Sequence, residues 1–164
     1  MNRQSWKAGL RSKLVGLAAA GLVCGTAAAH HSFAMYDLSK HETFTGQLTR
    51  FVVGANHSQL IFNLIGDDGM LKRGADGKPI IWGVETTSAQ QLARRGITVK
   101  SFKVGTILTV TLHPLRDGRN FGALRYEDGI LISCGLSMPK GGCNEQTGKI
   151  FVGKGAQDSN AGGR

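Results

Sequence analysis

A regular alternation of apolar and polar residues, which begins near Thr43, most constrains the fold of this 164-residue chain. In residues 43–53, Phe44, Gly46 and Leu48 alternate with three polar residues. A period of two is typical of a β-strand that buries one face and leaves the other in water. We therefore expect a mainly β protein whose strands turn their apolar faces toward a shared core.

Five further segments have strand character and are separated by turn-forming residues: 59–65, 80–85, 107–113, 121–126 and 130–133. One short helix is expected after the third strand, because Thr87 and Gln90 have the spacing of a capping box. Gly96 can take the left-handed conformation that ends such a helix. This order predicts a small OB-like antiparallel β-barrel of five to six strands with one short helix. An open antiparallel sheet with a helix on its face is the alternative.

The N-terminal residues have the three-part layout of a secretory signal. Four basic residues come first, the apolar run from Leu14 to Val23 follows, and small residues end in Ala29. This run is shorter than the roughly 20 apolar residues that a membrane-spanning helix needs. We therefore expect cleavage after Ala28 or Ala29, and a periplasmic or secreted protein that keeps no membrane span.

The expected organisation is a signal peptide at 1–29, an OB-like barrel at 30–134 and a Gly-rich tail at 135–164, in which residues 149–152 favour a short edge strand. The formal charge of +9 includes the leader; without its four basic residues, 16 basic and 11 acidic side chains give +5. These basic residues are spread singly rather than clustered. Because an exported protein also rarely meets nucleic acid, we do not expect a nucleic-acid-binding function.

Cys134 and Cys143 remain after removal of the leader, which contains the third cysteine, Cys24. In an oxidising compartment, two cysteines this close together in Gly-rich sequence favour a disulfide loop. The alternative is a thiol metal site with Met138 as a third sulfur ligand, since soft ligands suit Cu(I).

Two histidines follow the predicted cleavage site directly. Cleavage after Ala29 makes His30 the first residue, so its α-amine and ring can chelate one metal ion. A third nitrogen would then come from His31, His57 or His113. Cleavage one residue earlier lets the amine of Ala29, backbone amides and His31 form a square-planar site, which Cu(II) and Ni(II) favour. The competing interpretation is a solvated leader with only incidental metal affinity.

A second hypothesis is a binding module, because OB-like barrels take up ligands or partners on one open face. That face could bind another envelope protein or a small ligand through aromatic residues that are otherwise expected in the core: Phe51, Trp82, Phe121 and Tyr126. Catalysis is not expected, since the sequence has no nucleophile elbow, phosphate-binding glycine loop or His-Glu-x-x-His helix. None of the available carboxylates has a histidine at a sequence spacing that indicates a catalytic pair. These carboxylates are Glu85, Glu127, Asp67 and Asp68.

Four short segments resemble a family of small exported bacterial proteins that is catalogued only as a domain of unknown function. Two of them are Ala-His-His-Ser-Phe-Ala-Met-Tyr-Asp at 29–37 and Phe-Thr-Gly-Gln-Leu-Thr-Arg-Phe at 44–51. The others are Val-Gly-Thr-Ile-Leu-Thr-Val-Thr at 104–111 and His-Pro-Leu-Arg-Asp-Gly at 113–118. The resemblance spans residues 29–133 and implies a periplasmic OB-like barrel without an established activity. Members commonly have Asn-Pro-His at the turn into the second strand, where this chain has Asn56-His57 without the proline.

Overall fold

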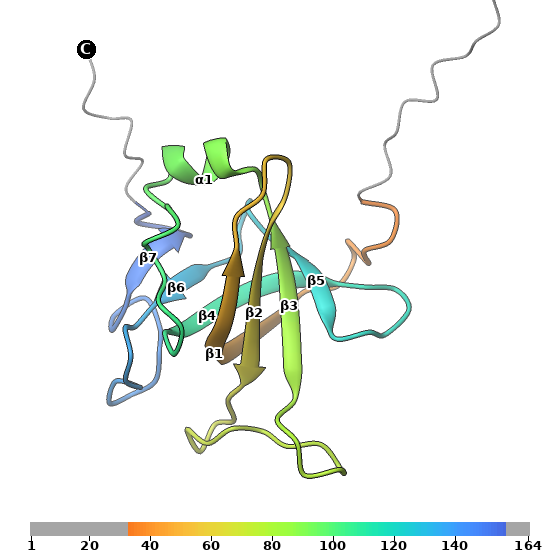
Figure 1. Cartoon of the computed structure of the whole chain (residues 1–164), viewed down its shortest axis with the longest axis vertical. Helices are drawn as coiled ribbons and strands as arrows, with labels where there is room; N and C mark the ends of the chain where they lie inside the picture. Colours follow the sequence, from red (N-terminus) through yellow and green to blue (C-terminus); the bar gives the residue numbers. More distant parts are fainter. Residues whose placement is uncertain (1–32, 157–164) are drawn as a thin grey trace, which may run out of the picture. The chain divides into compact units, whose positions relative to one another are not determined.

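Seven strands and one short helix form residues 33–156, the part of the chain that the computed structural model describes (Figure 1). In chain order they are β1 (Glu42–Val52), β2 (Ser58–Leu64), β3 (Ile81–Thr86), α1 (Ala89–Arg94), β4 (Ile107–Pro114), β5 (Phe121–Leu124), β6 (Leu131–Ser133) and β7 (Lys149–Val152). The predicted signal peptide at 1–29 with its cleavage site at Ala29, the candidate ligands His30 and His31, and residues 157–164 lie outside the described residues. Within the described part, no helix is long and apolar enough to cross a membrane.

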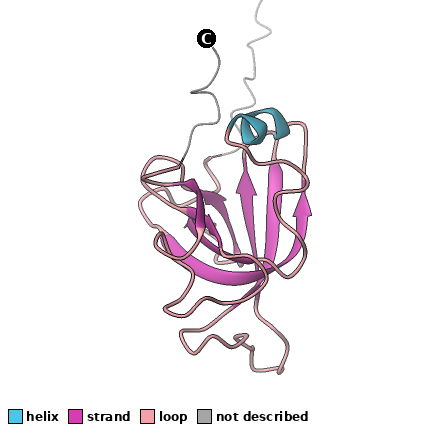
Figure 2. Cartoon of the chain, turned by 90° about the vertical axis from the view of Figure 1, so that its left-hand side faces the viewer, coloured by secondary structure: helices cyan, strands magenta, loops and turns pink. Residues whose placement is uncertain are grey.

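Five of the strands close into a barrel, and Figure 2 shows how they curve around a common centre. β1 pairs antiparallel with both β2 and β4, β2 pairs with β3, β3 pairs in parallel with β5, and β5 returns to β4. The other two strands lie outside this circle, since β6 pairs with β4 and β7 pairs with β6. The predicted mainly β, OB-like barrel with one short helix is confirmed, and the open sheet is wrong. The β3–β5 pairing is its one parallel contact.

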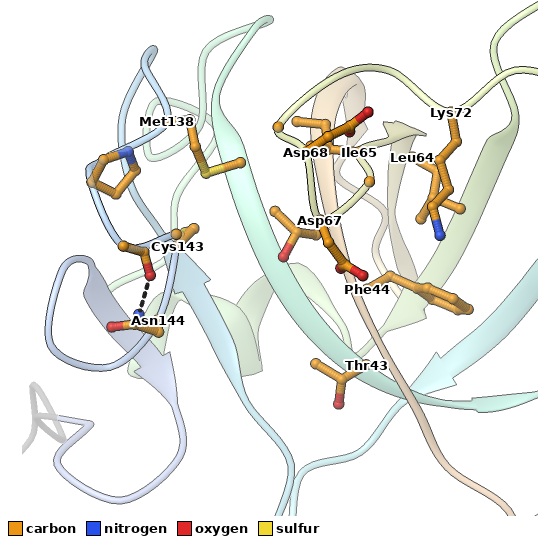
Figure 3. A pocket seen from close by; sticks show the side chains of 16 residues that line it. Thr43, Phe44, Leu64, Ile65, Asp67, Asp68, Lys72, Met138, Cys143 and Asn144 are labelled. Atoms are coloured by element: carbon orange, nitrogen blue, oxygen red, sulfur yellow. Dashed lines mark hydrogen bonds between the residues drawn. The ribbon is translucent and has the colours of Figure 1, made fainter.

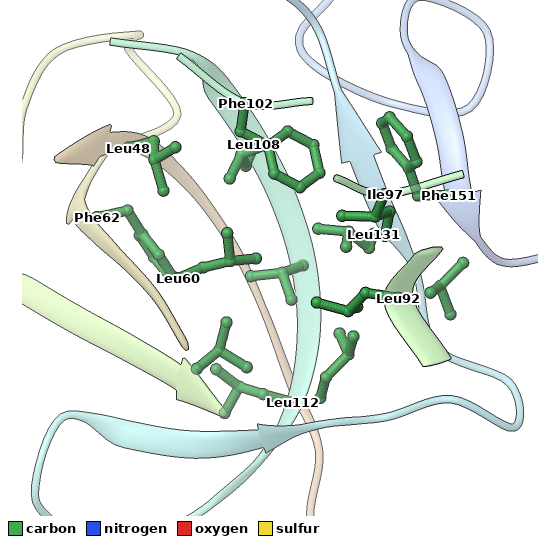
Figure 4. Close-up of a cluster of buried hydrophobic side chains, with 14 of the residues drawn as sticks. Leu48, Leu60, Phe62, Leu92, Ile97, Phe102, Leu108, Leu112, Leu131 and Phe151 are labelled. Atoms are coloured by element: carbon green, nitrogen blue, oxygen red, sulfur yellow. The ribbon is translucent and has the colours of Figure 1, made fainter. Parts of the chain in front are cut away.

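The inner faces of the barrel strands form the core, as the alternation predicts (Figure 4). Leu48 of β1, Phe62 of β2 and Leu112 of β4 are each at most 1 % exposed. Leu92 is the buried residue of α1 and belongs to the same cluster, so the helix covers one end of the barrel. Burial of this apolar surface is the main driving force for closing the barrel.

The aromatic residues considered for a binding face take part in packing. Phe51, Trp82 and Tyr126 are partly buried against the main core, and Phe121 packs on a separate small cluster. The ring of Phe44 lies 4.3 Å from that of Trp82, measured between centroids. Their placement favours the core interpretation of these residues over an open aromatic surface.

The helix begins one residue later than the capping-box prediction. Ser88, not Thr87, is the N-cap, and its hydroxyl accepts a hydrogen bond from the backbone N–H of Gln91 at 3.3 Å. The hydroxyl of Thr87 donates instead to the side chain of Gln91. Both residues have N-cap chemistry, so spacing along the sequence does not choose between them. Gly96 has the expected left-handed conformation, with a φ of 70°.

Cys134 and Cys143 form the predicted disulfide, with their Cα atoms 5.7 Å apart. The alternative thiol metal site with Met138 is therefore wrong. The disulfide closes a loop on the outside of the barrel, where Cys143 is buried in a small apolar cluster. The hydroxyl of Thr109 on β4 donates to the carbonyl of Cys143 at 2.7 Å. β7 then follows as the predicted short edge strand, so this part of the Gly-rich tail belongs to the fold.

Candidate functional site

The segment from Met35 to Asp37 is held along the outside of the barrel. The N–H of Asp37 donates to the carbonyl of Pro114 at 2.8 Å, and the N–H of Arg116 donates to the carbonyl of Met35 at 3.0 Å. Between these bonds, Tyr36 forms a β-bridge with the residue that follows β4. Tyr36 is only 1 % exposed. The chain is therefore fixed to the end of β4 a few residues after the predicted mature N-terminus.

Strand register brings two of the sequence-predicted ligands to this same outer face. Ala123 of β5 lies opposite both His113 of β4 and Glu85 of β3, so these three residues form one row across three strands. Paired residues on neighbouring strands point to the same side of a sheet. His57 directly precedes β2, and its contact with Glu85, the partner of Gln59, brings it to the same side as well.

Glu85 connects His57 to the segment that carries Tyr36. The Nδ1 atom of His57 lies 3.2 Å from Oε1 of Glu85. Tyr36 packs on Ala123 in the middle of the row. Burial, followed by the negative charge of Glu85 and a hydrogen bond to its carboxylate, raises the pKa of Tyr36 to about 12. The tyrosine therefore stays protonated at neutral pH, with its phenol near the carboxylate of Glu85.

The oxygen atoms near Nδ1 of each ring decide which imidazole nitrogen is available to a metal ion. Nδ1 of His57 faces a carboxylate, and Nδ1 of His113 lies 2.7 Å from the carbonyl oxygen of Lys40. Both oxygens only accept hydrogen bonds, so in the neutral ring the proton is on Nδ1 and Nε2 keeps its lone pair. Metal-bound histidines commonly have this arrangement, with the second nitrogen donating to a carboxylate or carbonyl. Both rings therefore offer Nε2 as a ligand.

His41 has the opposite arrangement. The guanidinium of Arg125 donates to its Nδ1 at 3.2 Å, so in the neutral ring the proton is on Nε2. Arg125 also forms a hydrogen-bonded ion pair with Asp128. The hydrogen bond to Asp128 raises the pKa of the guanidinium. The lone pair of His41 thus faces a cation, which makes His41 a poor metal ligand.

The described residues do not complete a metal site by themselves. Nowhere in residues 33–156 do three histidine, cysteine, aspartate or glutamate side chains come close enough together to hold a metal ion. His57 and His113 share an outer face, but Glu85 and Ala123 separate them along the row. A site centred on either histidine therefore needs ligands from outside this part of the chain.

A family of unknown function, DUF6152, matches residues 19–125. The chain belongs to this family. No curated protein and no solved structure matches it. The residues of this DUF6152 protein that match the family include every histidine discussed as a ligand and both partners of the His57–Glu85 contact. The disulfide between Cys134 and Cys143 lies beyond the matched residues.

Glu85 is the residue of this DUF6152 domain that sequence reasoning missed. The sequence shows no carboxylate with a histidine partner at an indicative spacing, yet Glu85 contacts His57 from 28 positions further along the chain. The antiparallel register of β2 and β3 makes the connection by pairing Gln59 with Glu85. The intervening residues form a long, irregular hairpin with isolated bridges, such as the one between Arg73 and Pro79. The contact between His57 and Glu85 can therefore be recognised only when the register of β2 and β3 is known.

Proposed function

We propose that this protein is an exported, non-enzymatic barrel of the periplasm or cell exterior that binds Cu(II) through its mature N-terminus, with His57 as the ligand contributed by the barrel. The observation that carries the proposal is the contact of 3.2 Å between Nδ1 of His57 and Oε1 of Glu85. This contact leaves Nε2 as the nitrogen with a lone pair. Because the side chain of His57 is half exposed, a metal ion has access to it.

The length of the leader supports a shared site. His31 stands five residues before Tyr36, the residue that is buried against the barrel. The N–H of Tyr36 donates to the carbonyl of Phe33 at 3.1 Å, so residues 33–36 form a turn. From Phe33, two residues lead back to His31, which is a span of at most about 7 Å. We propose that this span, together with the histidine side chains, brings His30 and His31 to His57 beside Glu85, or to His113.

The donor set that results is rich in nitrogen. With His30 as the first residue, its α-amine and ring supply two ligands, and His57 supplies a third. With Ala29 first, the amine, backbone amides and His31 form a plane to which His57 adds one more nitrogen. Cu(II) binds such donors most strongly among the divalent first-row metals. Protons compete for the same lone pairs, so the affinity should fall as pH drops through about 6.5.

The test uses the full-length chain exported by a bacterial host, so that any cleavage is the natural one. Mass spectrometry of the purified product identifies its first residue. Cu(II) titration followed by electron paramagnetic resonance gives the affinity and the number of nitrogen ligands. We expect Glu85→Gln to lower the Cu(II) affinity by about tenfold, since it removes the negative charge that Nδ1 of the ligand His57 contacts. His57→Ala should lower it at least as much and remove one nitrogen from the spectrum.

His41→Ala is the matched control, because it removes an exposed histidine whose lone pair faces Arg125. Its Cu(II) affinity should equal that of the unchanged protein, whereas replacing both His30 and His31 by alanine should abolish the site. Equal, weak binding by all of these proteins would overturn the proposal, as would a product that begins beyond Ser32. That outcome would favour the alternative, an accessory module whose barrel binds an envelope protein or a small ligand.

A further inference from the structure

A cleft of about 700 Å³ separates the barrel wall from the disulfide loop (Figure 3). One side is formed by β1, the end of β2 and the turn at 66–69, and the other by residues 138–144. Its volume lies in the range of small-molecule sites, roughly 300–1,000 Å³. Neither His57 nor Glu85 lines it, so the cleft is separate from the proposed copper site. Only the first of its two sides lies within the residues matched to the family.

The wall formed by the disulfide loop is held in place by several bonds. The bond between Cys134 and Cys143 fixes the loop at its base. The hydroxyl of Thr109 donates to the carbonyl of Cys143, and the side-chain amide of Asn144 donates to the carbonyl of Gly141 at 3.0 Å. The cleft is therefore formed before a ligand arrives, which lowers the conformational cost of binding.

Two opposite charges line the cleft without a partner. Asp67 and Lys72 make no ion pair with each other or with any other residue in the part of the chain that the structure describes. Figure 3 shows both side chains extending into the cleft toward Phe44. Lys72 lies against Gly66, the residue before Asp67, since a Cβ atom on Gly66 would be 3.4 Å from Cε of Lys72. An ammonium and a carboxylate thus lie near one another and stay available to a ligand.

The rest of the lining is mixed, with polar residues such as Thr43, Thr45 and Asn144 beside three apolar side chains. Met138 is partly buried against the cluster around Cys143, and Pro139 continues the same wall. Phe44 lines the cleft from β1. A ligand whose charged groups meet Asp67 and Lys72 therefore has apolar surface within reach for the remainder of its structure.

We propose that the cleft binds a small zwitterion whose ammonium and carboxylate groups are close together, the chemistry of a free amino acid with an apolar side chain. Its ammonium pairs with Asp67, its carboxylate pairs with Lys72, and its side chain covers Met138. A cation alone would leave Lys72 unpaired beside another positive charge. An anion alone would face the carboxylates of Asp67 and Asp68. A ligand with both charges satisfies both sides of the cleft.

The test compares three probes on the exported protein in the presence of a chelator, so that copper takes no part. L-Leucine carries both charges, L-leucinamide lacks the carboxylate, and N-acetyl-L-leucine lacks the ammonium. Titration followed by nuclear magnetic resonance should show L-leucine shifting backbone signals of residues 43–45, 64–72 and 138–144 at millimolar concentrations or below. Blocking either charged group should weaken binding by at least about tenfold, because each removes a charge-assisted hydrogen bond.

Asp67→Asn and Lys72→Gln should each weaken L-leucine binding by at least about tenfold. The matched controls are Asp76→Asn and Lys78→Gln, which change a neighbouring exposed ion pair of 3.6 Å that does not line the cleft. Both controls should bind like the unchanged protein. The proposal is wrong if L-leucine causes no shifts at millimolar concentrations, if L-leucinamide binds as tightly as L-leucine, or if the control changes weaken binding as much as the cleft changes do.

Discussion

The ionisation of Tyr36 predicts how alkaline pH changes the stability of the barrel. Burial beside Glu85 raises the pKa of Tyr36 from 10.0 to about 12. A group whose folded pKa is raised contributes its full stabilisation below the unfolded pKa and loses it as pH rises through the folded pKa. The unfolded chain therefore releases the phenol proton first, and the free energy of unfolding falls between pH 10 and pH 12.

The size of this effect follows from the two pKa values. Each unit of difference corresponds to about 1.36 kcal/mol, so the complete contribution of Tyr36 is at most about 3 kcal/mol. At about pH 11 the unfolded tyrosine is mostly ionised and the folded one mostly neutral, which lowers the free energy of unfolding by about 1 kcal/mol relative to about pH 8. Although the side chain of Tyr36 is 1 % exposed, the phenol lies near the surface, where solvent screens part of this difference, so the measured loss should be at most this large.

Urea unfolding of the unchanged protein and of Tyr36→Phe, each at about pH 8 and about pH 11, measures the effect. At the lower pH the variant should be less stable by about 1 kcal/mol, because it lacks the hydroxyl that interacts with Glu85. Phenylalanine does not ionise, so this difference should shift by about 1 kcal/mol in favour of the variant at the higher pH. A stability difference that stays constant between the two pH values would refute the argument.

Two further changes test the packing outside and inside the barrel. Replacing both Cys134 and Cys143 by serine should lower the free energy of unfolding by about 2–3 kcal/mol, because the disulfide closes a short loop; an unchanged urea midpoint would contradict this. Gly46→Ala should destabilise the protein by about 1–3 kcal/mol through overpacking, because its Cβ would lie 2.1 Å from Cδ2 of Phe62. A melting temperature equal to that of the unchanged protein would show that this contact relaxes freely.

The features that depend on local chemistry are predictable from the sequence. The alternation around Leu48 reflects the geometry of a single strand, and it correctly indicates which face enters the core. The bond between Cys134 and Cys143 is equally local, since the two residues are nine positions apart. Helix capping is less certain, because Thr87 and Ser88 can both serve and the surrounding fold selects Ser88.

The candidate site depends on register between distant strands, and that is why it could be predicted only in part. His57 and His113 are recognisable as possible ligands from their chemistry. Their tautomers, however, are set by Glu85 and by the carbonyl of Lys40, which strand pairing brings to them. The row from His113 to Glu85 also requires the parallel β3–β5 pairing, and the local pattern of residues in these strands does not specify a parallel neighbour.

The double pairing of β1 has a consequence for how the domain assembles. Its partner β2 follows almost at once, whereas Thr43 and Thr45 meet Thr111 and Thr109 across separations of 68 and 64 residues. Contacts between such distant residues slow folding, because a long loop must close before the contact gives any stability. The seam between β1 and β4 should therefore close late, and until then the chain exposes an unpaired strand edge to its neighbours.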